Sequence, residues 1–230
     1  MRSGGLVMVV GRALDRVASP EVERYRAAIV LGALREDVIR VPGLARPVEH
    51  WSLSHFWRPG RGGFMRAWPG ARAAAVRRFT RAVAHHRAVD PARAYVELGR
   101  AAHVVVDMAC PVHVHRALHD TDRYEWYVEA HADELAALPA VPTPQLDSVA
   151  AIVDGLARLT AVMPVDRHQH AVGRWLRRRG LVRPTRAPVR DAAIAIIPAA
   201  IAHVAALIER FAATTARPAI AGNEWSADAR

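Results

Sequence analysis

Histidine and carboxylate side chains are concentrated in one short stretch of this sequence. Between residues 103 and 125 lie His103, Asp107, His113, His115, His119, Asp120, Asp122 and Glu125. Imidazole nitrogens and carboxylate oxygens are the usual ligands of a catalytic zinc ion. Cys110 is the only cysteine, so neither an intrachain disulfide nor a closed zinc site of several thiolates can form. The stretch therefore predicts a catalytic metal centre rather than a structural one.

His103 and Asp107 form the clearest pair in this stretch. They lie four residues apart within a predicted helix, so they project from the same face and can hold one ion together. Pro111 then ends the helix, and His113 lies six residues beyond Asp107. An HxxxD pair alone is a weak indication, but the neighbouring histidines and carboxylates strengthen it.

Helices are expected to position these residues. Apolar residues recur at spacings of three and four, which predicts helices at about 5–17, 20–34, 71–86, 91–109, 122–138, 145–163, 167–179 and 188–214. Pro198 is expected to kink or split the last of them. Because no linker divides the sequence, we expect one all-α domain over residues 1–230, with 222–230 as a flexible tail.

A long loop interrupts this helical pattern at residues 38–70. Its many proline and glycine residues exclude a long helix. It also carries His55 beside Phe56 and Trp57, and aromatic side chains at this density need a surface on which to pack. The loop is therefore expected to fold against the helices and to carry function.

The strongly basic composition has two explanations. The formal net charge is +10, which could attract phosphate-bearing partners such as nucleic acid or a membrane surface. All 32 basic residues are arginine, however, which a GC-rich genome would produce without selection for binding, and this explanation is favoured. The densest basic run is Arg174, Arg177, Arg178, Arg179, Arg183 and Arg186, and a solvated helix face is favoured there over a phosphate-binding surface.

No run of 18 apolar residues that would predict a transmembrane segment is present, and the stretch from Leu6 to Val10 is too short for a secretory signal. Cytoplasmic residence is the default expectation, with secretion the alternative if the true start lies upstream.

Three sequence pieces resemble the bacterial zinc-dependent phospholipases C. The first is the segment 98–107, which begins with LGRAAH and ends at Asp107, and the others are CPVH at 110–113 and YEWYV at 124–128. In this order they reproduce the family's HxxxD, PxH and YExxV motifs. Upstream, LSHFWRPG at 53–60 is similar to the family's histidine-bearing loop, and GALRED at 32–37 is similar to the turn that bears its first aspartate. The resemblance covers roughly residues 12–129 and implies an all-helical fold.

The resemblance also implies a set of metal ligands. The first zinc ion would be held by Asp37, His55, His103 and Asp107, with Asp107 placed to bridge to a second ion. The second zinc ion would be held by His113 and Glu125. The family's remaining histidine position is Thr121 in this sequence, so His119 is the favoured substitute and Asp122 the alternative. The third site is doubtful, because Met1 and Leu6 stand where the family has its terminal tryptophan and a nearby histidine.

The resemblance implies phospholipase C-type cleavage of a phospholipid or a related phosphodiester by metal-activated water. Asp37 is the candidate general base and Glu125 the alternative. Phospholipid is the expected substrate, and transient contact with a membrane surface is possible. Two alternatives are a single-strand nuclease of the same fold, which usually has Asp in the place of Glu125, and a metal-binding helical protein without activity.

Overall fold

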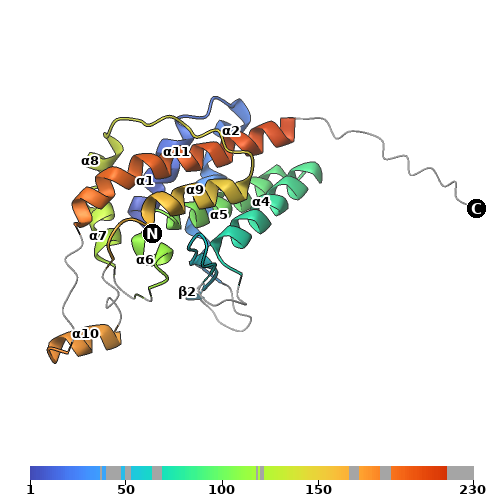
Figure 1. Cartoon of the computed structure of the whole chain (residues 1–230). Coiled ribbons are helices and arrows are strands. Elements are labelled where there is room, and N and C mark those ends of the chain that lie inside the picture. Colours follow the sequence, from blue (N-terminus) through green and yellow to red (C-terminus); the bar gives the residue numbers. More distant parts are fainter. Residues whose placement is uncertain are drawn as a thin grey trace, which may run out of the picture.

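The computed structural model of the chain describes residues 1–36, 38–39, 48–49, 53–63, 69–117, 119, 122–165, 171–181 and 188–216. Within these residues the architecture is all-α, as the sequence predicted (Figure 1). The helices are α1 (Ser3–Leu14), α2 (Pro20–Arg24), α3 (Arg26–Leu34), α4 (Ala71–Arg87), α5 (Pro91–Asp107), α6 (Pro111–Val114), α7 (Arg123–Ala130), α8 (Ala132–Ala136), α9 (Val149–Thr160), α10 (Ala171–Arg178) and α11 (Val189–Ala216). The 3₁₀-helix η1 (Leu53–His55) and an antiparallel pair, β1 (Val38–Ile39) with β2 (Val48–Glu49), lie between α3 and α4.

The predicted starts of two helices are confirmed by their caps. The Ser19 side chain accepts a hydrogen bond from the Val22 amide, and the Asp90 side chain accepts one from the Arg93 amide. In both helices a proline occupies the first turn, where its missing N–H costs nothing. These local signals explain why the boundaries could be placed from sequence.

Two predicted helices are each divided by one residue. The helix predicted at 20–34 breaks at Tyr25, and the one predicted at 122–138 breaks at His131. Each ring stacks on another ring, Tyr25 on Tyr95 with centroids 4.7 Å apart and His131 on Tyr127 at 4.2 Å. The first of these contacts joins α2 and α3 to α5, which helical spacing alone does not reveal.

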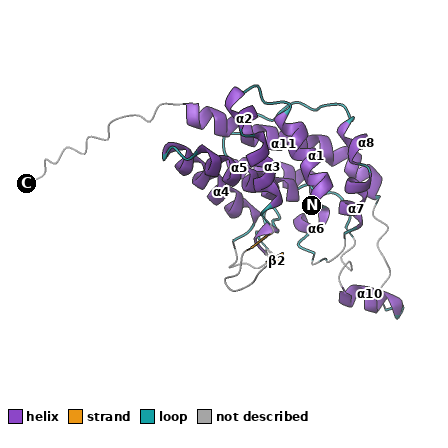
Figure 2. Cartoon of the chain, turned by 180° about the vertical axis from the view of Figure 1, so that it is seen from behind, coloured by secondary structure: helices purple, strands orange, loops and turns teal. Residues whose placement is uncertain are grey.

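The core lies around α5 and α11. Figure 2 shows α3, α4 and α5 packed together, with α11 crossing the same body. α11 continues through Pro198 and is not split at that point. By length and composition α11 could cross a membrane, but 72% of its most apolar window is buried within the structure, as expected of a core helix.

Gly32 on α3 and Gly99 on α5 allow these two helices to approach closely. A Cβ atom at Gly99 would overlap the backbone carbonyl of Ile29, and one at Gly32 would overlap that of Val96. The obstacle at both positions is backbone, which cannot rotate away. The two glycines therefore determine the distance between α3 and α5, and α5 carries His103 and Asp107.

Gly99→Ala should separate α3 from α5 and lower the free energy of unfolding by about 3 kcal/mol, the upper range for overpacking a core. Thermal and denaturant unfolding would measure this. Gly11→Ala is the matched control, because nothing lies within 4 Å of a Cβ there. That change should stabilise α1 by roughly 0.5–1 kcal/mol. Equal stability of the two variants would contradict the role of the glycine contact.

Candidate metal centre

Histidine and carboxylate side chains converge in two adjacent groups. One group is His55, His103 and Asp107, and the other is His113, His119 and Glu125. In each group, one potential ligand atom from every residue lies within 4.8 Å of the others. Five structural elements contribute: η1, α5, α6, the segment after α6, and the first turn of α7. The fold thus gathers residues from 55 to 125 at one place.

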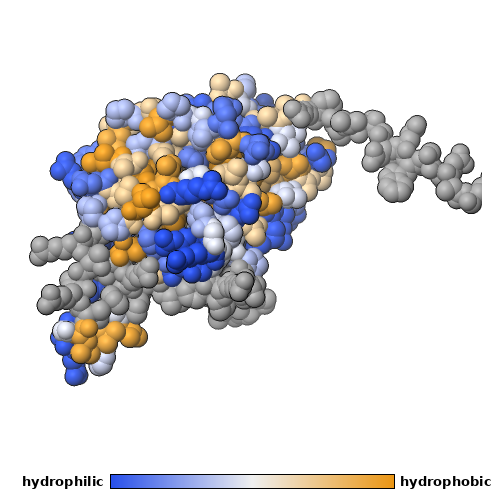
Figure 3. All heavy atoms as spheres, viewed as in Figure 1, coloured by the Kyte–Doolittle hydropathy of each residue, from blue (hydrophilic) through white to orange (hydrophobic). Residues whose placement is uncertain are grey.

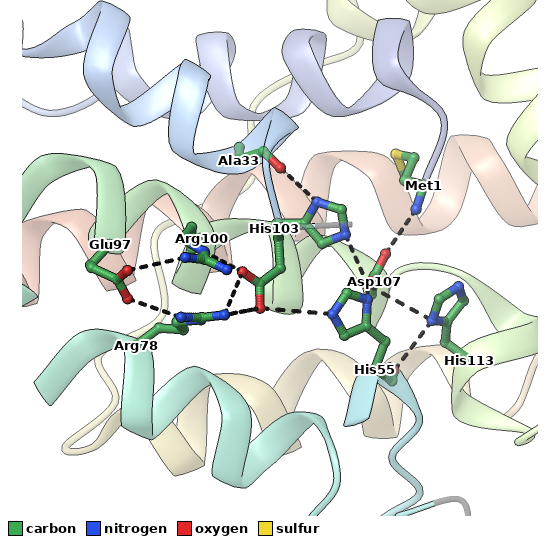
Figure 4. Close-up of polar contacts among 10 residues, drawn as sticks. Met1, Ala33, His55, Arg78, Glu97, Arg100, His103, Asp107 and His113 are labelled. Carbon is green, nitrogen blue, oxygen red and sulfur yellow. Dashed lines mark hydrogen bonds and ion pairs between the residues drawn. The ribbon is translucent and has the colours of Figure 1, made fainter. Parts of the chain in front are cut away.

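Asp107 lies between the two groups and is completely buried. Its Oδ2 atom is 2.8 Å from His55 Nδ1 and 3.3 Å from His103 Nε2. The same oxygen is 3.8 Å from His113 Nδ1, so it also reaches the second group. Figure 4 shows these rings directed toward the carboxylate. This position suits a carboxylate that contacts two cations.

Glu125 occupies the corresponding position in the second group. Its Oε1 atom is 3.6 Å from His113 Nε2 and 3.8 Å from His119 Nε2. Glu125 lies in the first turn of α7, which directs its side chain back toward α6. His119, rather than Asp122, therefore comes together with His113 and Glu125.

Asp122 has a different local role. Its side chain accepts a hydrogen bond from the Tyr124 amide at 3.1 Å and caps α7. A capping residue followed three positions later by glutamate is a recognisable signal for a helix start. The Asp122 to Glu125 spacing carries that signal in the sequence.

Backbone carbonyls orient three of the histidine rings. His103 Nδ1 lies 2.8 Å from the Ala33 carbonyl oxygen. His113 Nδ1 lies 3.2 Å from the His55 carbonyl oxygen, and His119 Nδ1 lies 3.2 Å from the Ala117 carbonyl oxygen. Because a carbonyl only accepts, Nδ1 must carry the hydrogen in each ring. A neutral ring then has its lone pair on Nε2, which faces Asp107 in His103 and faces Glu125 in His113 and His119. This is the tautomer that a metal-binding histidine requires.

Glu36 is buried beside His55 in a cluster of charges, and its partners Arg78 and Arg100 are labelled in Figure 4. Its carboxylate pairs with Arg78 at 3.0 Å and Arg100 at 2.5 Å, and Glu97 pairs with the same two arginines at 3.3 and 3.2 Å. Glu36 Oε1 is also 3.9 Å from His55 Nε2. Burial alone would raise the pKa of Glu36, but His55 and the arginines outweigh burial and lower the pKa to about 2. Glu36 therefore stays ionised beside His55.

The carboxylates of the two groups already surround a cation. The ammonium group of Met1 donates to Asp107 Oδ1 at 2.8 Å and lies 3.3 Å from Glu125 Oε1, fully buried. Burial would raise the pKa of both carboxyl groups, yet attraction from this ammonium and from the histidines holds each pKa well below its ordinary value. Two ionised carboxylates are faced by the Nδ1 atom of His55 and by the Nε2 atoms of His103, His113 and His119. This donor set fits zinc.

Asp37, Asp120 and Thr121 are outside the described residues. His115 contacts Arg58 and the Met163 carbonyl instead of either group. Sequence reasoning missed the part played by Glu36, although it directly precedes Asp37 in the motif shared with the phospholipases C.

The aromatic residues near the centre have separate positions. Phe56 is buried and stacks on His113, with centroids 5.3 Å apart. The Trp57 indole N–H donates to Asp154 at 2.7 Å. Trp126 is exposed, and the Arg2 guanidinium stacks over its ring at 3.6 Å. Among the described candidates, Phe56 makes a ring contact with the metal centre itself, through His113 and His119.

Comparisons with known proteins identify the fold. No protein-family model matches the sequence, and no curated protein does. Among solved structures, an alpha toxin from Clostridium absonum matches with a TM-score of 0.65 and 16% identity, covering 94% of this chain and 66% of the toxin. The alpha-toxin of Clostridium perfringens from an avian strain matches with a TM-score of 0.62 and 13% identity, covering 90% and 62%. The chain therefore shares the fold of these two bacterial toxins, and it spans about two thirds of their length.

Proposed function

We propose that this chain is a zinc-dependent phosphodiester hydrolase that acts on phospholipids in the manner of a phospholipase C. The observation that carries the proposal is the pair of histidine and carboxylate groups joined at Asp107. The sequence pieces shared with the zinc-dependent phospholipases C coincide with these residues, and the fold likeness to the toxins is consistent with them.

The proposed ligands follow the two groups. His55, His103 and Asp107 would hold one zinc ion, together with Asp37, which follows α3 in the sequence. His113, His119 and Glu125 would hold the other, and Asp107 would contact both. Two bound zinc ions would polarise a phosphoryl oxygen and lower the pKa of water that attacks it.

The protein's own residues would position this reaction. The Nδ1 contacts with carbonyls hold the rings of His103, His113 and His119 in one orientation, so little reorganisation is needed. Asp37, with Glu125 as the alternative, would accept a proton from the attacking water. The water oxygen forms a bond to phosphorus, and the bond from phosphorus to the glycerol oxygen breaks. The leaving oxygen takes up a proton and gives diacylglycerol and a phosphorylated head group.

The test combines zinc analysis with three substrates. Purified protein should contain about two zinc ions per chain and hydrolyse phosphatidylcholine to diacylglycerol and phosphocholine. Single-stranded DNA and a soluble phosphodiester such as bis-p-nitrophenyl phosphate are assayed in parallel. Hydrolysis of DNA in preference to lipid would replace the phospholipase by a nuclease. Full zinc occupancy without turnover of any substrate would identify a metal-binding protein without activity.

A further inference from the structure

The short helix α10 exposes apolar side chains instead of burying them. Val172 is 61% exposed, Trp175 is 52% exposed, and Leu181 just beyond the helix is 67% exposed. Val172 and Trp175 lie three residues apart, so they share one face of the helix. Such exposure of large apolar residues within a few positions of one another is unusual and marks an interaction surface.

Cations accompany this apolar face. Arg178 and Arg179 are exposed, and the Arg179 guanidinium lies 5.3 Å from the centre of the Trp175 ring. No aspartate or glutamate occurs in the sequence from 167 to 190, so the helix has no acidic neighbour along the chain. Apolar and aromatic residues on one face with arginine beside them are typical of helices that lie in the surface of an anionic bilayer.

The position of α10 matches such a role. Figures 1 and 2 both show α10 projecting from the end of the molecule at which α6 and the N-terminus lie. His113 lies on α6, and the Met1 ammonium group at the N-terminus contacts Asp107 and Glu125. Figure 3 shows hydrophobic and strongly hydrophilic residues side by side on the projecting segment.

We propose that α10 is an interfacial anchor that binds the surface of a bilayer containing anionic phospholipids, with Val172, Trp175 and Leu181 inserted and Arg178 and Arg179 at the head groups. A nucleic acid would satisfy the arginines but leave the aliphatic side chains in water. A second copy of this chain, with a net charge of +10, would repel the arginine cluster. Membrane binding itself is independent of the proposed function. The further consequence, that α10 brings the metal centre to its lipid substrate, rests on the proposed function.

Vesicle co-sedimentation of the full, zinc-loaded chain tests the anchor. Vesicles of phosphatidylcholine alone are compared with vesicles that also contain phosphatidylglycerol, at about 0.1 M and about 0.5 M NaCl, because salt screens the attraction to head groups. The test variants are Val172→Ser/Trp175→Ser and Arg178→Glu/Arg179→Glu. The controls are Val76→Ser/Val162→Ser, which also replaces two exposed apolar residues by serine, on α4 and after α9, and Arg77→Glu/Arg81→Glu, which makes the same charge reversals at exposed positions on α4.

The wild type should bind the anionic vesicles at least about tenfold more strongly than the neutral ones, and less strongly at high salt. Each α10 double variant should lose at least about tenfold of that binding, whereas both controls retain it. Equal binding by the wild type and the α10 variants would overturn the proposal, as would binding of single-stranded DNA in place of vesicles. Self-association that depends on Trp175 would also overturn it.

Zinc content and hydrolysis of the soluble phosphodiester separate this proposal from the proposed function. The anchor is supported if the α10 variants lose vesicle binding but keep their zinc content and their hydrolysis of the soluble phosphodiester. Vesicle binding by a wild-type protein that hydrolyses nothing contradicts only the proposed function. Hydrolysis without any affinity for vesicles contradicts only the anchor.

Discussion

His103→Ala is expected to remove zinc from the first site and to reduce phosphodiesterase activity to background. The ring is buried, its Nδ1 is fixed by the Ala33 carbonyl, and its Nε2 lies 3.3 Å from Asp107. If His103 is a direct ligand, as proposed, its loss should weaken zinc binding by more than the roughly 10- to 100-fold that is typical of losing a residue behind a ligand. Asp107→Asn should affect both sites, because Asp107 reaches both groups. Zinc per chain and hydrolysis of phosphatidylcholine are the two measurements.

His203→Ala provides the matched control for this experiment. His203 is also buried, and its Nδ1 also donates to a backbone carbonyl, that of Ala199 at 2.7 Å. It belongs to neither histidine and carboxylate group. His203→Ala should retain zinc even if it lowers stability. Full zinc occupancy in both His103→Ala and Asp107→Asn would refute the assignment of the centre.

Glu36→Gln is expected to lower both stability and zinc affinity. A glutamine cannot balance the charges of Arg78 and Arg100, and leaving buried ions incompletely paired costs about 3 kcal/mol. It also removes the negative charge beside His55 Nε2. Since a residue that orients a metal ligand is worth 10- to 100-fold in affinity, zinc binding should weaken by about that factor. Isothermal titration with zinc and denaturant unfolding would measure the two effects.

Glu97→Gln distinguishes orientation of His55 from simple stabilisation. Glu97 pairs with the same two arginines at similar distances, and no ion pair joins it to His55 among the described residues. It should therefore lose comparable stability while keeping its zinc affinity. If Glu97→Gln weakens zinc binding as much as Glu36→Gln, then Glu36 acts only through the stability of the fold.

The contribution of Glu36 to stability should depend on pH with a defined sign. The pKa falls from an ordinary 4.5 to about 2 in the folded chain, so the unfolded chain takes up the proton first as the pH falls. The stabilisation is thus complete above pH 4.5 and disappears toward about pH 2. The difference in unfolding free energy between wild type and Glu36→Gln should shrink across this range. A constant difference would mean that the Glu36 charge is not its source.

Much of the fold follows from local signals. Apolar spacing predicted the long helices, and Ser19-Pro20 and Asp90-Pro91 located two of their starts, because caps depend only on adjacent residues. The breaks at Tyr25 and His131 were not predicted. Helix propensity depends on the residues within one segment, whereas the Tyr25 ring stacks on Tyr95 of another helix, α5. The role of Asp37 remains a prediction, since it lies outside the described residues.

The sequence by itself determined that His103 and Asp107 share one helix face, because a spacing of four is set by the helical repeat. Only the tertiary structure decided what meets them there. His55 contacts Asp107 across about fifty positions of sequence, and Glu36 lies beside His55 with its charge balanced by Arg78 and Arg100. The structure likewise groups His119 with His113 and Glu125, whereas Asp122 caps α7. Periodicity is a property of neighbouring residues, but the convergence of charged side chains depends on how the helices pack. The packing of α3 on α5 depends in turn on Gly32 and Gly99, where a Cβ atom would overlap the facing backbone.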